Sequence, residues 1–193
     1  MRLKLLEASA LIWAIFGAYW ILSATRGRGH SAPPARSEPH FYRPLRISLL
    51  VLAFLLLFWK PAAFGSLARR FMPPSDAIAI VGFALFLVGL AIAVLARVHL
   101  GQYWSDKVML QAGHRLIHTG PYAHVRHPIY SGVLLGIAGT ALILGEWRGL
   151  LSFLLMLVNY SIKALREENI LRAQFGPEFE QYKNHTGFLL PGL

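Results

Sequence analysis

Long runs of apolar residues, separated by short polar segments, dominate the pattern along this chain of 193 residues. A helix needs about 20 mostly apolar residues to cross the hydrocarbon core of a bilayer. The runs that approach this length each predict a membrane helix: Leu5–Ala24, Leu45–Phe64, Ala77–Val98, Ile129–Gly145 and Gly149–Leu165. The pattern therefore predicts an all-α integral membrane protein with about five transmembrane helices.

Breaks in the pattern predict how these helices connect. Lys60 and Pro61 interrupt the second run, so its helix either ends at Trp59 or continues with a kink. Only residues 146–148 separate the fourth and fifth runs, a distance that permits nothing but a tight antiparallel hairpin. The fourth and fifth helices must therefore pack side by side.

One side of the predicted fourth helix carries Gly132, Gly136 and Gly139. Small residues at this spacing let the backbone of another membrane helix approach closely. We therefore expect a second helix to pack against this glycine-lined side.

Composition narrows the class of protein further. Apolar residues make up 55% of the chain and charged residues only 15%, a balance typical of membrane proteins. The chain has no cysteine, which excludes disulfides, thiolate metal sites and cysteine nucleophiles. In so apolar a chain, the net charge of +10 indicates anionic membrane lipids rather than nucleic acid as partners.

The distribution of lysine and arginine predicts the orientation in the membrane. These residues concentrate in the basic loop after the first run, in the loop at 99–128 and in the tail at 163–193. Cytoplasmic loops carry an excess of lysine and arginine. We therefore expect an outside N-terminus and a cytoplasmic C-terminus, in what we take to be a bacterial inner membrane.

Candidate chemistry lies first in residues 100–130. The Gly-Pro pair at 120–121 predicts a structured loop rather than one long helix. His127 directly precedes Pro128, which the first turn of a helix tolerates well. His127 would then lie at a helix N-terminus, where unpaired amides and the helix dipole favour an anion such as a ligand carboxylate.

A second polar stretch continues the fifth helix until the Gly-Pro pair at 176–177, a strong stop signal. Lys163 and Glu167 are four residues apart and share a face of this helix. A carboxylate at the end of a membrane helix is costly unless it faces a cavity or a partner, which makes Glu167 a functional candidate. The alternative is that these side chains, like the nearby histidines and tyrosines, are ordinary residues of a membrane interface.

We predict no metal site. The histidines of the loop have no matching acidic partners nearby: His114, His118, His124 and His127.

Two segments in a fixed order carry a resemblance to a known family. "HRLIHTGPYAHVRHPIYSG", a hydrophobic hairpin and then "REENILRAQFGPEFEQYKNHTG" resemble the isoprenylcysteine carboxyl methyltransferases and their relatives, the phospholipid N-methyltransferases. The resemblance implies a membrane enzyme that takes S-adenosyl-L-methionine from the cytosol and a lipophilic acceptor from the bilayer. It also implies a methyltransferase core at 75–193, with a cofactor loop at 99–128, after a two-helix membrane region at 1–74.

The resemblance also implies site residues. Its cofactor contacts fall on His114, Arg115, Leu116, Ile117, Tyr122, His127, Pro128, Ile129, Tyr130 and Glu167. Its substrate-carboxylate arginine corresponds to Lys163.

The remaining catalytic candidates depend on the acceptor. A carboxylate acceptor needs only a positioning cation, for which Lys163 or Arg166 would serve, whereas an amine acceptor needs a base such as Glu168. We predict methylation of the carboxylate of an isoprenylcysteine-like or other isoprenoid substrate.

Three alternatives remain open from the sequence. The chain could be a phospholipid amine N-methyltransferase, a nicotinamide-dependent membrane reductase of the sterol type, or a non-catalytic membrane protein whose polar loop only anchors it.

Overall fold

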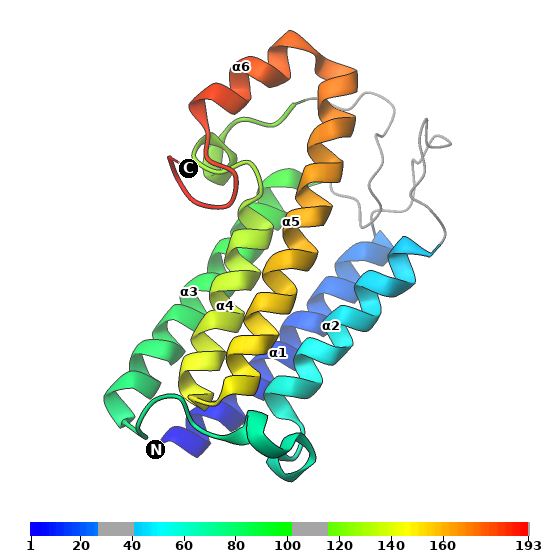
Figure 1. Cartoon of the computed structure of the whole chain (residues 1–193). Coiled ribbons are helices and arrows are strands. Elements are labelled where there is room, and N and C mark those ends of the chain that lie inside the picture. Colours follow the sequence, from blue (N-terminus) through cyan, green and yellow to red (C-terminus); the bar gives the residue numbers. More distant parts are fainter. Residues whose placement is uncertain (27–40, 102–115, 193) are drawn as a thin grey trace.

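The computed structural model describes residues 1–26, 41–101 and 116–192, and these residues form helices and turns without an extended strand. Five long helices run side by side along one axis (Figure 1). They are α1 Arg2–Arg26, α2 Tyr42–Phe58, α3 Asp76–Leu100, α4 Pro128–Leu144 and α5 Trp147–Phe175. Three shorter helices complete the described chain: η2 Pro61–Ala68, η4 Gly120–Ala123 and α6 Pro177–His185. The predicted all-α class is confirmed, and each of the five predicted runs contains most of one long helix. The number of helices that cross the membrane stays a prediction.

Local signals explain where the last helices begin and end. Gly145 has a φ of 64° and closes α4, and α5 begins at Trp147, so the predicted tight hairpin is present. Gly176 has a φ of 50° and ends α5, because a left-handed backbone favours glycine. Pro177 then begins α6, as the stop signal indicated.

The interrupted second run ends rather than continues. α2 stops at Phe58, and η2 follows at an angle of 88° to it. Pro61 has no backbone N–H and therefore cannot continue the hydrogen bonding of α2, so the chain turns sharply there.

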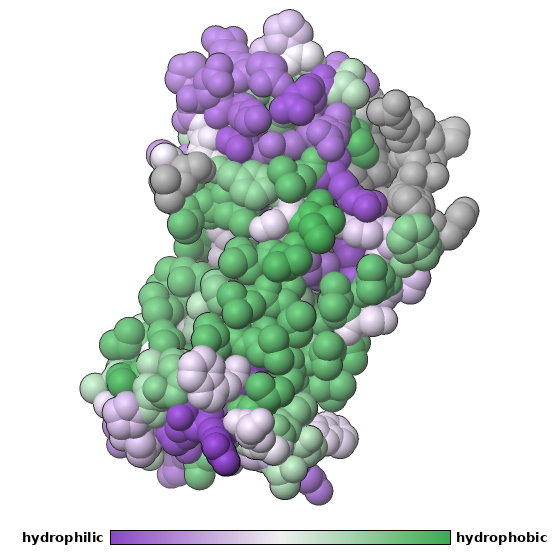
Figure 2. All heavy atoms as spheres, viewed as in Figure 1, coloured by the Kyte–Doolittle hydropathy of each residue, from purple (hydrophilic) through white to green (hydrophobic). Residues whose placement is uncertain are grey.

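The bundle is that of an integral membrane protein. Three of the described helices are long and apolar enough to cross a membrane, and α2 with η2 makes a fourth span if the bent pair is counted as one. α4 is also apolar but has only 17 residues. In Figure 2 hydrophobic side chains cover the middle of the bundle, and hydrophilic ones gather toward its two ends.

α4 lies against α3 at close range, through the glycines that the sequence singled out. A Cβ atom added at Gly132 would lie 2.5 Å from the carbonyl oxygen of Gly89. A Cβ atom at Gly139 would lie 2.4 Å from the carbonyl oxygen of Gly82. Only glycine permits this approach, so the predicted close helix packing is confirmed.

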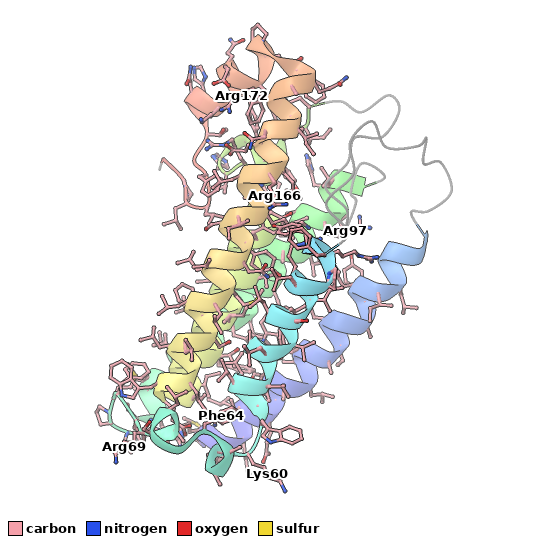
Figure 3. All side chains as sticks on the ribbon, turned by 45° about the vertical axis from the view of Figure 1, so that its right-hand side comes forward. Lys60, Phe64, Arg69, Arg97, Arg166 and Arg172 are labelled. Carbon is pink, nitrogen blue, oxygen red and sulfur yellow. The ribbon has the colours of Figure 1, made fainter. Side chains whose placement is uncertain are left out.

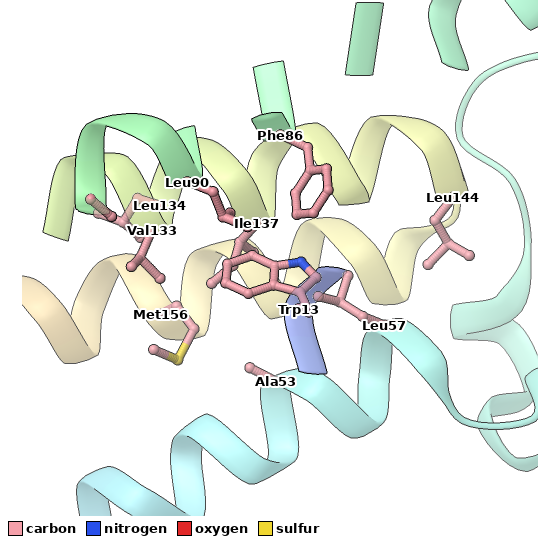
Figure 4. Close-up of a cluster of buried hydrophobic side chains, with 11 residues drawn as sticks. Trp13, Ala53, Leu57, Phe86, Leu90, Val133, Leu134, Ile137, Leu144 and Met156 are labelled. Atoms are coloured by element: carbon pink, nitrogen blue, oxygen red, sulfur yellow. The ribbon is translucent and has the colours of Figure 1, made fainter. Parts of the chain in front are cut away.

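Trp13 anchors α1 in the middle of the core (Figure 4). Its ring packs against Phe86 of α3, and its indole nitrogen donates to Thr140 of α4 over 3.1 Å. Leu57 of α2 and Met156 of α5 belong to the same cluster. All five long helices therefore share one core. The division of the chain into a two-helix membrane region at 1–74 and a methyltransferase core at 75–193 stays a prediction.

Candidate functional site

The start of α4 and the last turns of α5 meet at one end of the bundle. His127 is buried and precedes Pro128 at the start of α4. Its ring lies between two consecutive carboxylates of α5, with Nδ1 3.6 Å from Glu167 and Nε2 3.3 Å from Glu168. Two stretches about forty residues apart in sequence thus meet at one imidazole.

Glu168 is fully engaged by neighbouring side chains. Arg126 Nε donates to its Oε1 over 2.6 Å, and the side chains of both residues are buried. Arg126 also donates to the carbonyl oxygens of Lys183 and Thr186. This pair therefore joins the loop, α5 and the C-terminal tail.

The tail folds back over the loop. The Arg126 amide donates to the Gly187 carbonyl over 2.9 Å, and the Gly187 amide donates to the His124 carbonyl over 3.1 Å. The Tyr182 hydroxyl donates to the Tyr122 carbonyl over 2.7 Å. The two polar stretches of the sequence therefore lie against each other.

Glu167 is the more accessible of the two carboxylates. Its side chain is 23% exposed, against 6% for Glu168. The Tyr130 hydroxyl donates to Glu167 over 2.6 Å, and Lys163 Nζ lies 3.6 Å away, which confirms the expected pairing along α5. Glu167 thus combines a fixed position with partial access.

A stack of rings forms one wall of the site. The Tyr130 ring stacks between His127, with centroids 5.5 Å apart, and Tyr160, with centroids 4.9 Å apart. Lys163 Nζ lies 5.2 Å from the centre of the Tyr130 ring, a cation–π distance. Phe188 of the tail meets His127 edge to face. The imidazole is therefore held rigidly on both sides.

The environment changes the acidity of the groups in the loop and tail. Burial lowers the pKa of His127, but the hydrogen bonds and charges of Glu167 and Glu168 outweigh it, so the net pKa is raised. Burial raises the pKa of Tyr182 to about 12, and burial also raises the pKa of Tyr122. Both phenols therefore stay neutral near pH 7.

The predicted cofactor residues fall into two groups. Most described members gather near the start of α4: Ile117, Tyr122, His127, Pro128, Ile129, Tyr130 and Glu167, with Ile117 packed against the cluster of Tyr122, Ile129 and Tyr130. Leu116 is buried. His114 and Arg115 lie outside the described residues.

The predicted catalytic residues separate in space. Lys163 and Glu168 lie beside the ring stack and the imidazole, as described above. Arg166 instead points toward α2, with its guanidinium 3.7 Å from the centre of the Tyr42 ring. Which of these residues act in a reaction stays a prediction.

Several contacts at the site were not expected from the sequence. In the sequence, Arg126 was only one of the positive charges of the loop at 99–128, although in the structure it pairs with Glu168. Tyr160 was missed, but it lies three and seven residues before Lys163 and Glu167, a helical spacing that could have indicated a shared face. Phe188 and Tyr42 follow no local pattern that points to the site.

Comparison with known proteins identifies the family of the chain. The model of the phospholipid methyltransferase family matches residues 77–178, which include α3 except for its first residue, all of α4 and α5, and the start of α6. The chain belongs to the phospholipid methyltransferase family. The resemblance described from the two sequence segments is confirmed.

Curated relatives of this family member are isoprenylcysteine O-methyltransferases. The protein-S-isoprenylcysteine O-methyltransferase of Schizosaccharomyces pombe is 35% identical over 107 residues, which cover 48% of this chain and 45% of that protein. A probable protein-S-isoprenylcysteine O-methyltransferase of Oryza sativa subsp. indica is 34% identical over 115 residues, which cover 57% of this chain and 60% of that protein. The chain spans about half the length of the curated relatives it matches.

A solved structure shares the fold. The eukaryotic intramembrane Ras methyltransferase ICMT superposes with a TM-score of 0.57 at 22% identity, covering 80% of this chain and 54% of that one. The similarity supports the helical membrane architecture.

Proposed function

We propose that this protein transfers a methyl group from S-adenosyl-L-methionine to the carboxylate of a lipophilic, isoprenylcysteine-like acceptor. The single observation that carries the proposal is the partly exposed Glu167 carboxylate, held by Tyr130, His127 and Lys163 where α4, α5 and the loop meet. The family and the names of its relatives support methyl transfer to an oxygen atom.

The residues present fit the proposed cofactor. The ammonium of S-adenosyl-L-methionine needs an anionic partner, and Glu167 is a carboxylate with partial access from solvent. The cofactor's carboxylate fits the start of α4, and Tyr122 and Ile117 offer an apolar surface for its adenosyl part. When bound, S-adenosyl-L-methionine supplies an electrophilic methyl group on its sulfonium.

The residues of the chain would act chiefly by alignment. Methyl transfer is an in-line displacement, which gains most from a fixed geometry and from exclusion of water. The stack of His127, Tyr130 and Tyr160 holds Glu167 in place. The tail covers the loop through Phe188 and Tyr182 and so limits access of water.

The charges around the site favour a carboxylate acceptor over an amine. A carboxylate is already a nucleophile at pH 7 and needs a cation to position it, for which Lys163 is available beside Tyr130. An amine must lose a proton first, and Glu168 is poorly suited as the base because Arg126 and His127 already occupy it.

The location of the site relative to the membrane is also part of the proposal. Thirteen of the 19 lysines and arginines fall in the sequence segments 26–46, 97–126 and 163–183, which contain the connections of α1 to α2 and of α3 to α4, the last turns of α5 and the tail. By the positive-inside rule, this end faces the cytoplasm, where the methyl donor is made available. The bacterial inner membrane stays our prediction for the compartment.

The test uses purified protein in lipid nanodiscs with S-adenosyl-L-methionine labelled in its methyl group. N-acetyl-S-farnesylcysteine and phosphatidylethanolamine are offered separately as acceptors. We expect label on the prenylated cysteine, and we expect mild alkali to release it as methanol, because esters hydrolyse and methylamines do not. Label on the amine lipid that resists alkali would replace this proposal with an N-methyltransferase.

The same preparation separates the other classes. Binding of NADPH without binding of S-adenosyl-L-methionine would indicate a reductase, and binding of neither would indicate a protein without this catalytic role.

A further inference from the structure

Asn159 is a polar side chain in the apolar part of α5, and its amide oxygen has no partner. The residue is only 6% exposed. Its amide nitrogen donates to the sulfur of Met156 in the same helix over 3.8 Å. Within residues 1–26, 41–101 and 116–192, no hydrogen bond reaches its amide oxygen. Polar residues inside membrane helices are rare, and they mark functional positions.

Helix packing does not account for this amide. Polar side chains in membrane helices often join two helices through hydrogen bonds. Ser152 of α5 does so, because its hydroxyl donates to the carbonyl oxygen of Ala53 in α2 over 2.9 Å. Asn159 lies two turns farther along α5, and it makes no such bond to another of the described helices. Its amide oxygen is therefore available to a ligand.

The side of α5 that carries Asn159 packs against α2. Ser152, Asn159 and Arg166 are spaced by seven residues, which is two helical turns, so they lie along one side of α5. Ser152 reaches Ala53 of α2, as described above. The Arg166 guanidinium lies 3.7 Å from the centre of the Tyr42 ring, which also belongs to α2. Figure 3 shows Arg166 on α5 near the upper end of α2. Asn159 lies between these two contacts.

Asn159 is also next to the proposed acceptor site. Lys163, which we propose to position the acceptor's carboxylate, follows Asn159 by one helical turn. Lys163 Nζ lies 3.6 Å from Glu167 and 5.2 Å from the centre of the Tyr130 ring. Met156, one turn before Asn159, is fully buried in the hydrophobic core. Asn159 therefore lies between the charged end of the site and the apolar interior, where the remainder of a lipophilic acid would extend.

The free atom indicates which chemical group the ligand supplies. An amide oxygen only accepts hydrogen bonds, so its partner must be a donor. In an N-acylated prenylcysteine the carboxylate and the amide N–H are attached to the same carbon atom. A carboxylate held by Lys163 therefore brings an N–H toward the neighbouring turn of α5. A plain isoprenoid acid has no such donor.

We infer that Asn159 accepts a hydrogen bond from the amide N–H of an N-acylated S-prenylcysteine and so selects this class of acceptor over plain isoprenoid acids. The inference rests on the proposed function and deepens it, because it names the part of the acceptor that is recognised besides the carboxylate. A site built to hydrogen-bond a substrate N–H discriminates against an analogue that lacks it.

The test compares three acids in nanodiscs, with S-adenosylhomocysteine present so that no turnover occurs. N-acetyl-S-farnesylcysteine carries the amide, S-farnesylthiopropionic acid lacks the whole acetamido group, and N-acetyl-N-methyl-S-farnesylcysteine keeps the carbonyl but lacks the N–H. We expect the wild-type protein to bind the first acid about fivefold or more tightly than each of the others. This comparison tests the inference even if a variant does not fold.

The variant Asn159→Leu keeps a similar volume and removes the acceptor atom. We expect its affinity for N-acetyl-S-farnesylcysteine to fall about fivefold or more. Its affinities for S-farnesylthiopropionic acid and for S-adenosylhomocysteine should stay unchanged, because neither ligand uses the amide oxygen. A role in helix packing alone would weaken the binding of both acids together or would lower only the midpoint of thermal unfolding.

Ser152→Ala is the matched control, because it removes a polar group from the same side of α5. It should keep the wild-type preference. Equal wild-type affinities for the N–H and the N-methyl acid, or an unchanged preference in Asn159→Leu, would overturn the inference and leave the proposed function standing. Failure of all three acids to bind would instead contradict the proposed acceptor itself.

Discussion

The two ends of the bundle each bury a pair of arginine and glutamate. At the end near η2, Arg148 Nε donates to Glu146 over 2.6 Å. The other side of the same guanidinium donates to the carbonyl oxygens of Leu56, over 2.9 Å, and Trp59, over 3.0 Å. Arg148 thereby satisfies the last carbonyl groups of α2, which have no partner within their own helix.

At the opposite end, Arg126 and Glu168 form an equally buried pair, but the polar contacts do not stop there. They continue through His127 to the partly exposed Glu167 and on to Lys163. A buried ion pair by itself is therefore no sign of a functional site. A ligand site is indicated where the network reaches a partly exposed charge, as it does at Glu167.

Removal of Arg148 should have the largest effect on stability. Arg148→Met leaves Glu146 and the end of α2 without their partner, and breaking a buried pair costs about 3–5 kcal/mol. We expect a much lower midpoint of thermal unfolding in nanodiscs, with kcat/KM per folded molecule unchanged. Arg69→Met, an exposed residue at the same end, should unfold like the wild-type protein. Unchanged stability in Arg148→Met would mean that the two ends do not differ as described.

Neutralising Glu167 should act on binding rather than on stability. In Glu167→Gln the cofactor ammonium loses its proposed counter-charge, and we expect the affinity for S-adenosyl-L-methionine to fall about 30-fold or more by titration calorimetry. The exposed Glu180 provides the control variant Glu180→Gln, which should bind normally. Normal affinity in Glu167→Gln would remove the observation on which the proposed function rests.

An added methyl group between α3 and α4 should destabilise the packing of these two helices. In Gly132→Ala the new Cβ atom meets backbone atoms of Gly89 and Ala93 at 2.5 and 2.6 Å, so one helix must shift. Overpacking of this kind costs about 1–3 kcal/mol of unfolding free energy. Gly17→Ala is the control, because a Cβ atom there has nothing within 4 Å. Equal thermal midpoints for the two variants would show that the close approach is not needed.

The smallest effect should be a pH dependence that comes from His127. Its pKa in the folded protein is raised, so the stabilisation by the protonated ring is complete below the unfolded value of about 6.5 and is lost as pH rises through the folded value. We expect the stability difference between wild type and His127→Asn to shrink from pH 6 to pH 9. A difference that grows with pH would contradict the raised pKa.

Much of the architecture was predictable from the sequence. The lengths of the apolar runs predicted the five long helices, and the glycine spacing predicted that another helix approaches α4 closely, without indicating that this helix is α3. Pro128, Gly145 and Gly176 marked where helices begin or end. These features are local, because helix periodicity and backbone preferences depend on residues within a few turns of one another.

The separate roles of Glu167 and Glu168 were not predictable, although both lie in one recognised segment. The sequence places them side by side, and only the packing of α5 against the loop exposes the first and pairs the second with Arg126.

What the amino-acid sequence determined by itself, then, is a helical membrane protein with two polar stretches of the right chemistry. The tertiary structure alone decided that these stretches share one imidazole, that the tail covers the loop, and that Lys163 of α5 lies against the ring of Tyr130 of α4. The physical reason is that contacts between distant segments depend on how whole helices pack and rotate against each other, and no spacing along the chain encodes that.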